Sequence, residues 1–353
     1  MFRLPFRARR DRPASVQRLL VDADRAEVEG RYADAIDLLC SLNRQGSTPD
    51  VEVRLVRLRH LAFGELDRRT EVEAWPPQLP DLFPEVAGPP EVARDQLGTD
   101  VLGSALVNHG ALLVRGLLAR DQLGRIRDGI DRAFAGRDEW ELDRTIDAAP
   151  WFVPFVLPDG TELNREFVRK GGAVWTADSP RVLFELLEAY RAAGLDEIIT
   201  GYLGERPAVS LRKFTLRRVP GDIERADWHQ DGAFLGDDVR SVNVWVALTE
   251  CGDGAEAPGL ELVARRVPRV LETGTEGAMF NWSIGPGTVD RTLLEIDAPL
   301  IRPRFQPGDA LIFDDLLVHR TAFAPGLTRD RYAIESWFFA PSRFPDDQIP
   351  LVF

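Results

Sequence analysis

The spacing of apolar residues changes near residue 205 of the chain. Before this point, apolar residues recur with helical periodicity, and the pattern predicts helices at about 119–135 and 180–203. After it, short runs rich in Val, Phe, Trp and Leu are separated by Pro-Gly, Gly-Asp and Asp-Gly turns, as in successive β-strands. These runs are 208–219, 226–235, 240–249, 259–264, 299–305, 309–313 and 331–340, and an earlier apolar run covers 111–116. The pattern predicts a mainly β protein with flanking helices (α+β), built on a sandwich or jelly roll.

The N-terminal part of the chain has a different pattern. Residues 14–70 read as helices, and the spacing of Ala26, Gly30, Tyr32 and Ala35 resembles the middle of a tetratricopeptide hairpin. A third helix is predicted at about 50–68, after a break that contains Pro49. Because one hairpin cannot bury a continuous core, we expect these helices to dock on the rest of the chain or on a partner.

A proline-rich stretch, 71–90, separates the helical region from a second region, 91–353. Proline neither continues a helix nor pairs within a central strand, so this stretch is predicted to be a linker or a wrapping loop. The arginine-rich residues 1–13 are predicted to be a solvated tail.

Composition excludes several classes of function. The chain has 44 basic and 57 acidic residues, a net charge of −13, and such a surface repels nucleic acid. No apolar run reaches the length of a membrane span, so no membrane partner is expected. Cys40 and Cys251 show no metal or redox spacing, and we expect reduced thiols in a cytoplasmic protein.

Two of the 4 histidines stand in a context that favours metal binding. On an extended segment, His229 and Asp231 would point to the same face, because side chains alternate across a strand. His319 follows the apolar run 309–313. Two imidazoles and one carboxylate form the facial triad that holds non-haem Fe(II) and leaves positions open. The pair His229 and Asp231 alone favours an ordinary turn histidine, and the context of His319 and of a later arginine reverses this preference.

Arg331 begins the last apolar run. A buried guanidinium needs an anionic partner, and beside an iron site it could bind the distal carboxylate of a dicarboxylate such as 2-oxoglutarate. An exposed salt bridge is the other interpretation, and periodicity does not separate the two.

These motifs, in this order, resemble the phytanoyl-CoA dioxygenase family over about residues 91–340. The motifs are Gly110–Leu118, His229-Gln230-Asp231, Val244–Leu248, Pro258–Val263, Gly308–Phe313 with His319-Arg320-Thr321, and Arg331–Ile334. The resemblance implies a double-stranded β-helix (a cupin-like jelly roll), a metal site of Fe(II), and 2-oxoglutarate and O2 as cosubstrates. It implies that His229, Asp231 and His319 are the metal ligands and catalytic residues.

The same resemblance assigns residues to 2-oxoglutarate. Arg331 would hold its distal carboxylate, Thr321 would assist, and Trp245 would lie beside it. Arg329 is the alternative to Arg331 if the preceding loop is offset by two residues, and Trp245 could also be an ordinary core residue.

The expected function is a 2-oxoglutarate-dependent dioxygenase that hydroxylates, or otherwise oxidises, an unactivated carbon of a small molecule. The intact Asp231 argues against halogenation, because halogenases of this fold have a small residue there. The alternatives are a non-catalytic jelly-roll protein that binds a metal or ligand and acts as an interaction module, and a metal-dependent isomerase or hydrolase.

The sequence does not name the substrate. Residues 258–266 depart from the family pattern, and the Arg265-Arg266 pair there could bind an acidic group or lie in a solvated loop. The expected substrate is a partly apolar small molecule, either free or linked to a carrier or to CoA. The candidate pocket residues are Trp175, Phe214, Phe234, Asn281 and Trp282.

Overall fold

The computed structural model describes residues 14–68, 74–236 and 238–353 of the chain. The arginine-rich tail predicted at 1–13 and the first residues of the predicted linker lie outside them. The α-helices are α1 Ala14–Val28, α2 Tyr32–Gln45, α3 Pro49–Leu61, α4 Thr99–His109, α5 Arg120–Leu142, α6 Glu166–Lys170, α7 Pro180–Ala192, α8 Leu195–Leu203, α9 Gly232–Leu235 and α10 Pro286–Ile296. The strands are β1 Glu91–Ala93, β2 Ala111–Arg115, β3 Ala173–Trp175, β4 Ala208–Val219, β5 Ser241–Ala247, β6 Leu260–Val263, β7 Leu300–Ile301, β8 Ala310–Phe313, β9 His319–Thr321, β10 Arg331–Phe339 and β11 Pro350–Val352.

Two sheets organise the second region. The large sheet has the order β1-β2-β8-β5-β10-β4-β11, with β3 also paired to β4, and all its pairs except β1–β2 are antiparallel. The small antiparallel sheet has the order β7-β6-β9. Isolated bridges extend it, from His229 to His319 and from Trp228 to Ile284. The α+β part of the prediction is therefore confirmed, although the helices contain more residues than the strands, so the protein is not mainly β.

The two faces of the large sheet pack against different layers. Along β10, Ile334 and Phe338 belong to a core shared with α4, α5, α7 and α8. The alternate residues Ala333, Trp337 and Phe339 belong to a second core shared with β6 of the small sheet. This period-2 alternation places one face of β10 under the helices and the other toward the small sheet.

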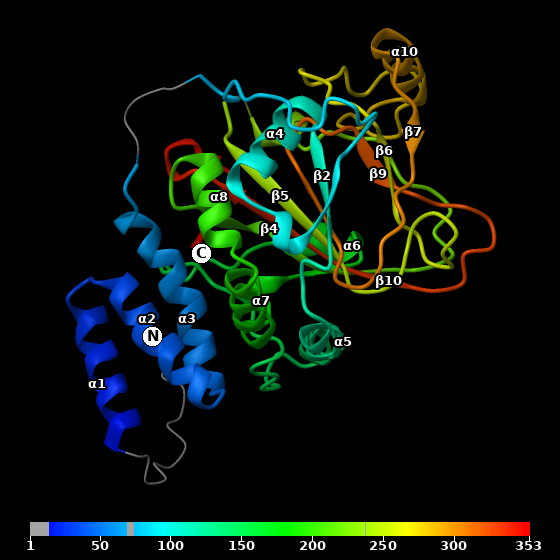
Figure 1. Cartoon of the computed structure of the whole chain (residues 1–353). Coiled ribbons are helices and arrows are strands. Elements are labelled where there is room, and N and C mark those ends of the chain that lie inside the picture. Colours follow the sequence, from blue (N-terminus) through cyan, green and yellow to red (C-terminus); the bar gives the residue numbers. More distant parts are fainter. Residues whose placement is uncertain (1–13, 69–73, 237) are drawn as a thin grey trace.

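The N-terminal helices pack against the body of the protein. In Figure 1, α1, α2 and α3 lie beside α7, whereas α10 and the small sheet lie at the opposite end. The buried Arg59 on α3 donates to the backbone oxygen of Val352 in β11 at 2.8 Å. Arg44 on α2 pairs with Glu188 on α7. The helical region and the sheet region therefore share one packed interface.

The chain from residue 74 to 90 lies along the body without regular structure. The Trp75 ring lies 5.2 Å from that of Tyr202 in α8, and His109 at the end of α4 contacts Asp81 at 3.0 Å. Among the described helices, none combines the length and the apolar character needed to span a membrane.

Four sequence expectations about elements were wrong in detail. The helix predicted at 180–203 is two helices, because Gly194 adopts a left-handed conformation with φ of +78° between them. The helix predicted to end near 68 ends at Leu61, and a 3-10 turn, Ala62–Glu65, follows. Within the predicted strand 299–305, only Leu300–Ile301 is a strand. The fourth case concerns 226–235.

The segment 226–235 is a strand only at its start. Trp228 and His229 make β-bridges, but Asp231 has helical angles (φ −66°, ψ −27°) and is the N-cap residue of the short helix α9. The amide of Gly232 donates to the backbone oxygen of Asp315 at 2.8 Å, which fixes this turn. Alternation along a strand therefore does not explain how His229 and Asp231 come to the same place.

Candidate functional site

His229 and Asp231, which are neighbours in sequence, meet the distant His319 where the small sheet faces the large one. His229 and His319 pair across the bridge through two backbone hydrogen bonds of 3.0 Å, and their ring centroids are 4.3 Å apart. Asp231 follows in the turn, with its Oδ2 3.9 Å from Nε2 of His319. One nitrogen or oxygen from each of these residues lies within 4.8 Å of the others. The three predicted ligands are thus close enough to share one ion.

Both imidazoles are oriented by backbone carbonyls. Nδ1 of His229 donates to the oxygen of Asp227 at 3.1 Å, and Nδ1 of His319 donates to that of Leu317 at 2.9 Å. A carbonyl can only accept, so each Nδ1 carries the proton and each Nε2 keeps a lone pair. Such outer partners fix the tautomer of metal-binding histidines. Burial, reinforced by the neighbouring His319, lowers the pKa of His229 to about 4, so its ring is neutral near pH 7.

Asp231 offers one free oxygen. Its Oδ1 accepts from Nζ of Lys213 at 2.9 Å, whereas its buried Oδ2 has no hydrogen-bond partner. Burial alone would raise the pKa of Asp231, but Lys213 and the two histidines lower it to about 2. A buried, ionised carboxylate oxygen without a partner is costly unless something binds it. The donor set of two imidazole nitrogens and this oxygen suits Fe(II).

Arg331 is the second buried group with an unfilled bonding position. Its side chain is only 1% exposed and its Nε has no partner. Its Nη1 donates to the backbone oxygen of Gly259 at 2.8 Å, and its Nη2 lies 3.4 Å from Oγ1 of Thr321. Within the described chain, no carboxylate lies within ion-pair distance of it. Burial lowers the pKa of Arg331 to about 10, so it remains a cation at neutral pH.

The other residues predicted to contact 2-oxoglutarate lie around Arg331. The ring of Trp245, on the neighbouring strand β5, is 5.4 Å from the guanidinium carbon of Arg331 and is buried. Thr321 is on β9, two residues after His319. The alternative clamp, Arg329, is 77% exposed at its side chain and pairs with Glu256 at 2.7 Å. Arg331 is therefore buried beside Thr321 on β9, whereas Arg329 faces solvent.

The candidate substrate residues divide into two groups. Trp282 lies 6.3 Å from His229 and 6.5 Å from Phe234, measured between ring centroids. The neighbouring Asn281 is exposed. Phe214, by contrast, lies on the opposite face of the large sheet, where it stacks on Tyr190, so its expected place near the metal was wrong. Trp175 lines a separate cavity.

The arginine pair predicted near the active-site lip is bound to the protein itself. Arg265 donates to the backbone oxygen of Ile296 at 2.6 Å, and Arg266 pairs with the buried Asp314 at 2.8 Å. Both arginines thus tie their loop to neighbouring segments.

The sequence analysis did not identify three polar residues on the face of the large sheet that borders the site. Lys213 and Arg217 lie on β4, and Glu335 lies on β10 with the residues that face the small sheet. Arg217 pairs with the buried Glu335 at 2.8 Å. The sequence alone could have indicated Lys213 and Arg217, because two cations four residues apart in an apolar strand lie on the same face of the sheet.

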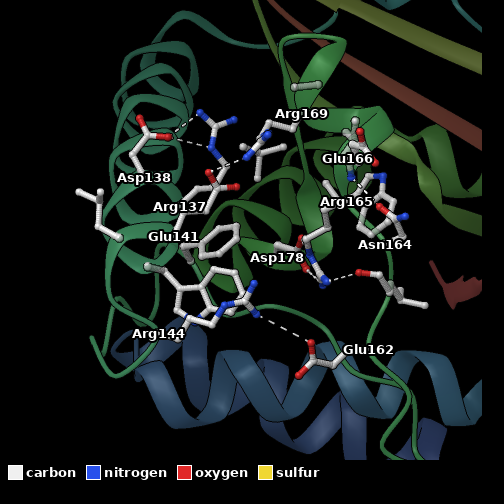
Figure 2. A pocket seen from close by; sticks show the side chains of 18 residues that line it. Arg137, Asp138, Glu141, Arg144, Glu162, Asn164, Arg165, Glu166, Arg169 and Asp178 are labelled. Carbon is white, nitrogen blue, oxygen red and sulfur yellow. Dashed lines mark hydrogen bonds and ion pairs between the residues drawn. The ribbon is translucent and has the colours of Figure 1, made fainter.

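A cavity away from the triad lies beside α5, α6 and β3. It has a volume of about 770 Å³ and is lined by α5, α6 and β3, including Trp175, and none of the triad residues lines it. Figure 2 shows its arginines beside acidic side chains. The pairs are Arg137–Asp138, Arg144–Glu162, Arg165–Asp178 and Arg169–Glu141. These pairs leave no arginine of the cavity without an acidic partner.

No protein-family model and no curated protein matches the chain. Among solved structures, the epimerase SnoN in complex with Fe3+, alpha ketoglutarate and nogalamycin RO is 15% identical, with a TM-score of 0.44 over 68% of this chain and 83% of that one. The carbocyclase SnoK from nogalamycin biosynthesis is 14% identical (TM-score 0.44; 71% and 87% covered). EctD from S. alaskensis with 2-oxoglutarate and 5-hydroxyectoine is 16% identical (TM-score 0.44; 68% and 75%). Similarities of this size do not by themselves assign an activity.

Proposed function

We propose that the protein is a non-haem Fe(II)- and 2-oxoglutarate-dependent oxygenase. One observation carries the proposal: two buried polar atoms without a hydrogen-bond partner, Oδ2 of Asp231 and Nε of Arg331, belong to side chains that approach the same strand. Oδ2 of Asp231 lies 3.9 Å from His319 on β9, and Nη2 of Arg331 lies 3.4 Å from Thr321, two residues further along β9. The first suits a cation and the second suits an anion. A metal ion chelated by a dicarboxylate satisfies both at once.

Each residue then has a defined task. His229 and His319 would bind Fe(II) through Nε2, because their Nδ1 atoms already donate to carbonyls. Asp231 would bind through Oδ2, while Lys213 holds Oδ1. Arg331, assisted by Thr321, would hold the distal carboxylate of 2-oxoglutarate, and Trp245 would lie beside it.

When bound, Fe(II) with O2 and 2-oxoglutarate supplies the oxidising power to attack an unactivated carbon, and 2-oxoglutarate becomes succinate and CO2. The protein's part is to hold these groups and to exclude water. The carboxylate of Asp231 occupies the position that a halide would need, so we propose hydroxylation or a related oxidation rather than halogenation.

We propose further that the large and small sheets together form a double-stranded β-helix. On this view the chain is a distant relative of the phytanoyl-CoA dioxygenases and acts in the cytoplasm. The site's position between the two sheets supports this, since small jelly rolls can hold a ligand between their sheets.

Turnover provides the test. Purified protein supplied with Fe(II), 2-oxoglutarate and O2 should form succinate, more rapidly when a metabolite mixture contains the substrate, and the His319→Ala variant should form none. A non-catalytic binding protein would form no succinate with any mixture. An isomerase or hydrolase would convert a metabolite without consuming O2 or 2-oxoglutarate. Either result would reject the proposed function.

A further inference from the structure

An exposed group of apolar side chains lies beside the metal-binding triad. The loop from residue 272 to 283 carries Met279 and Phe280, which are 46% and 48% exposed. The rings of Phe280 and Trp282 are stacked, 5.2 Å apart and only 5° from parallel. Large apolar side chains grouped on a surface commonly mark a binding site.

The position of this pair next to the triad is fixed by the backbone. The amide of Ile284, directly after the loop, donates to the oxygen of Trp228 at 2.8 Å, and Trp228 precedes the ligand His229. The Trp282 ring then meets the His229 ring edge to face, at 6.3 Å and 84°.

A second set of contacts reaches Asp231. Trp282 lies edge to face with Phe234 at 6.5 Å. The Phe234 ring in turn lies 3.9 Å from Nζ of Lys213, which pairs with Asp231. The stacked pair is therefore connected to two of the three ligands through direct side-chain contacts.

The loop is held in this shape by its own hydrogen bonds. The amide of Gly274 donates to the oxygen of Ser283 at 2.9 Å, which closes the loop. Oγ of Ser283 accepts from the amide of Phe280 and donates to its oxygen, both at 3.0 Å. Glu276 pairs with Arg291 on α10. A surface ordered before binding loses less entropy when a ligand arrives.

We propose that Phe280 and Trp282 form the substrate platform, and that the substrate is a small molecule with a planar ring system. This proposal rests on the proposed function. Two parallel rings offer a flat face that a planar ring can extend by stacking, whereas a flexible chain would have to lose rotational freedom for weaker contact. A ring bound there would lie beside the triad, because the Trp282 ring is 6.3 Å from that of His229.

The test compares a planar and a flexible probe of similar size, 2-naphthalenemethanol and 1-decanol. Under anaerobic conditions they are added to protein loaded with Fe(II) and 2-oxoglutarate, and the change in the weak visible absorption of chelated 2-oxoglutarate is followed. Naphthalene fluorescence anisotropy is measured in parallel without metal. The naphthyl probe should half-saturate at a concentration about 10-fold below that of decanol.

Two alanine variants and a matched control locate the binding of the naphthyl probe. Trp282→Ala and Phe280→Ala should each weaken this binding about 10-fold, whereas Phe167→Ala should change it less than about 2-fold. Phe167 is the matched control, because it is an aromatic residue on α6 that is 82% exposed. Phe280 has an exposed side chain, so its replacement spares the core.

Three results would overturn the platform: no binding of the naphthyl probe, equal binding of both probes, or unchanged binding in both variants. A dimer in light scattering that Phe280→Ala dissociates, with no probe binding, would instead identify the loop as a protein interface. If the visible absorption is absent but anisotropy shows naphthyl binding that Trp282→Ala and Phe280→Ala weaken, the proposed cofactor chemistry fails while the platform stands.

Discussion

Arg331 is a buried cation whose Nε has no hydrogen-bond partner, which suits the proposed binding of a carboxylate. Replacing it with lysine keeps the charge but removes the forked guanidinium that can bind a carboxylate with two hydrogen bonds. Losing one charge-assisted hydrogen bond of about 1.5–3 kcal/mol should raise the half-saturating 2-oxoglutarate concentration about 10- to 100-fold. The exposed Arg329 is the control, and Arg329→Lys should leave this concentration unchanged. Equal effects of both variants in a binding titration would remove Arg331 from its proposed role.

The carboxyl group of Asp315 should make the free energy of unfolding depend on pH. Burial, together with the neighbouring Asp314, raises the pKa of Asp315 from 3.8 to about 7. The folded state holds this proton more tightly than the unfolded state, so the stability that it contributes is present below pH 3.8 and is lost as pH rises to about 7. The Asp315→Asn variant has no carboxyl group to deprotonate at this position, so its stability does not fall for this reason as pH rises. The free energy of unfolding of the variant, relative to wild type, should therefore increase from pH 4 toward 7. A difference independent of pH would show that Asp315 has an ordinary pKa.

Several site residues could be predicted from local sequence, and others could not. His229, Asp231, His319 and Arg331 each stand in a short motif, and their order along the chain carried the prediction. Lys213 has no such motif, and it reaches Asp231 only because β4 and the turn before α9 meet in space. Tertiary contacts of this kind are not encoded in spacing.

At the scale of elements, α3 is attached to α7 by a buried ion pair. Arg181 on α7 pairs with Glu52, which is 0% exposed, and Asn43 donates to the same oxygen at 3.1 Å. Arg181→Met leaves this carboxylate without its cation, and we expect a loss of about 3 kcal/mol in the free energy of unfolding.

The double variant Arg181→Met/Glu52→Met should recover most of that loss, because no charge is left unpaired. Arg44→Met breaks the more exposed pair with Glu188 and should cost about 1 kcal/mol or less. Chemical denaturation of the three variants measures these values. Equal losses for Arg181→Met and Arg44→Met would show that burial of Glu52 does not matter.

Element types were predicted better than element ends. The strand 208–219 matches β4 residue for residue, because its apolar run is long and bounded by turn residues. The strand 226–235 was wrong beyond His229, because the turn at Asp231 is fixed by Asp315, which lies far along the chain. Helix α4 was not predicted.

At the scale of the molecule, the site depends on the meeting of two sheets. The small sheet supplies His319 and, through the bridge, His229, while the large sheet supplies Arg331, Trp245 and Lys213. The helices cover the other face of the large sheet, and α3 holds its edge strand β11 through Arg59. The proposed metal ligands and the proposed dicarboxylate clamp thus come from separate layers.

The central claim is that this junction binds Fe(II) and 2-oxoglutarate together. Anaerobic absorbance titration measures it most directly, because 2-oxoglutarate gives a weak visible charge-transfer absorption only when it chelates Fe(II). We predict that the absorption appears with both components in wild type, disappears in His229→Ala, and needs more 2-oxoglutarate in Arg331→Lys. No absorption in wild type, or an undiminished one in His229→Ala, would contradict the claim.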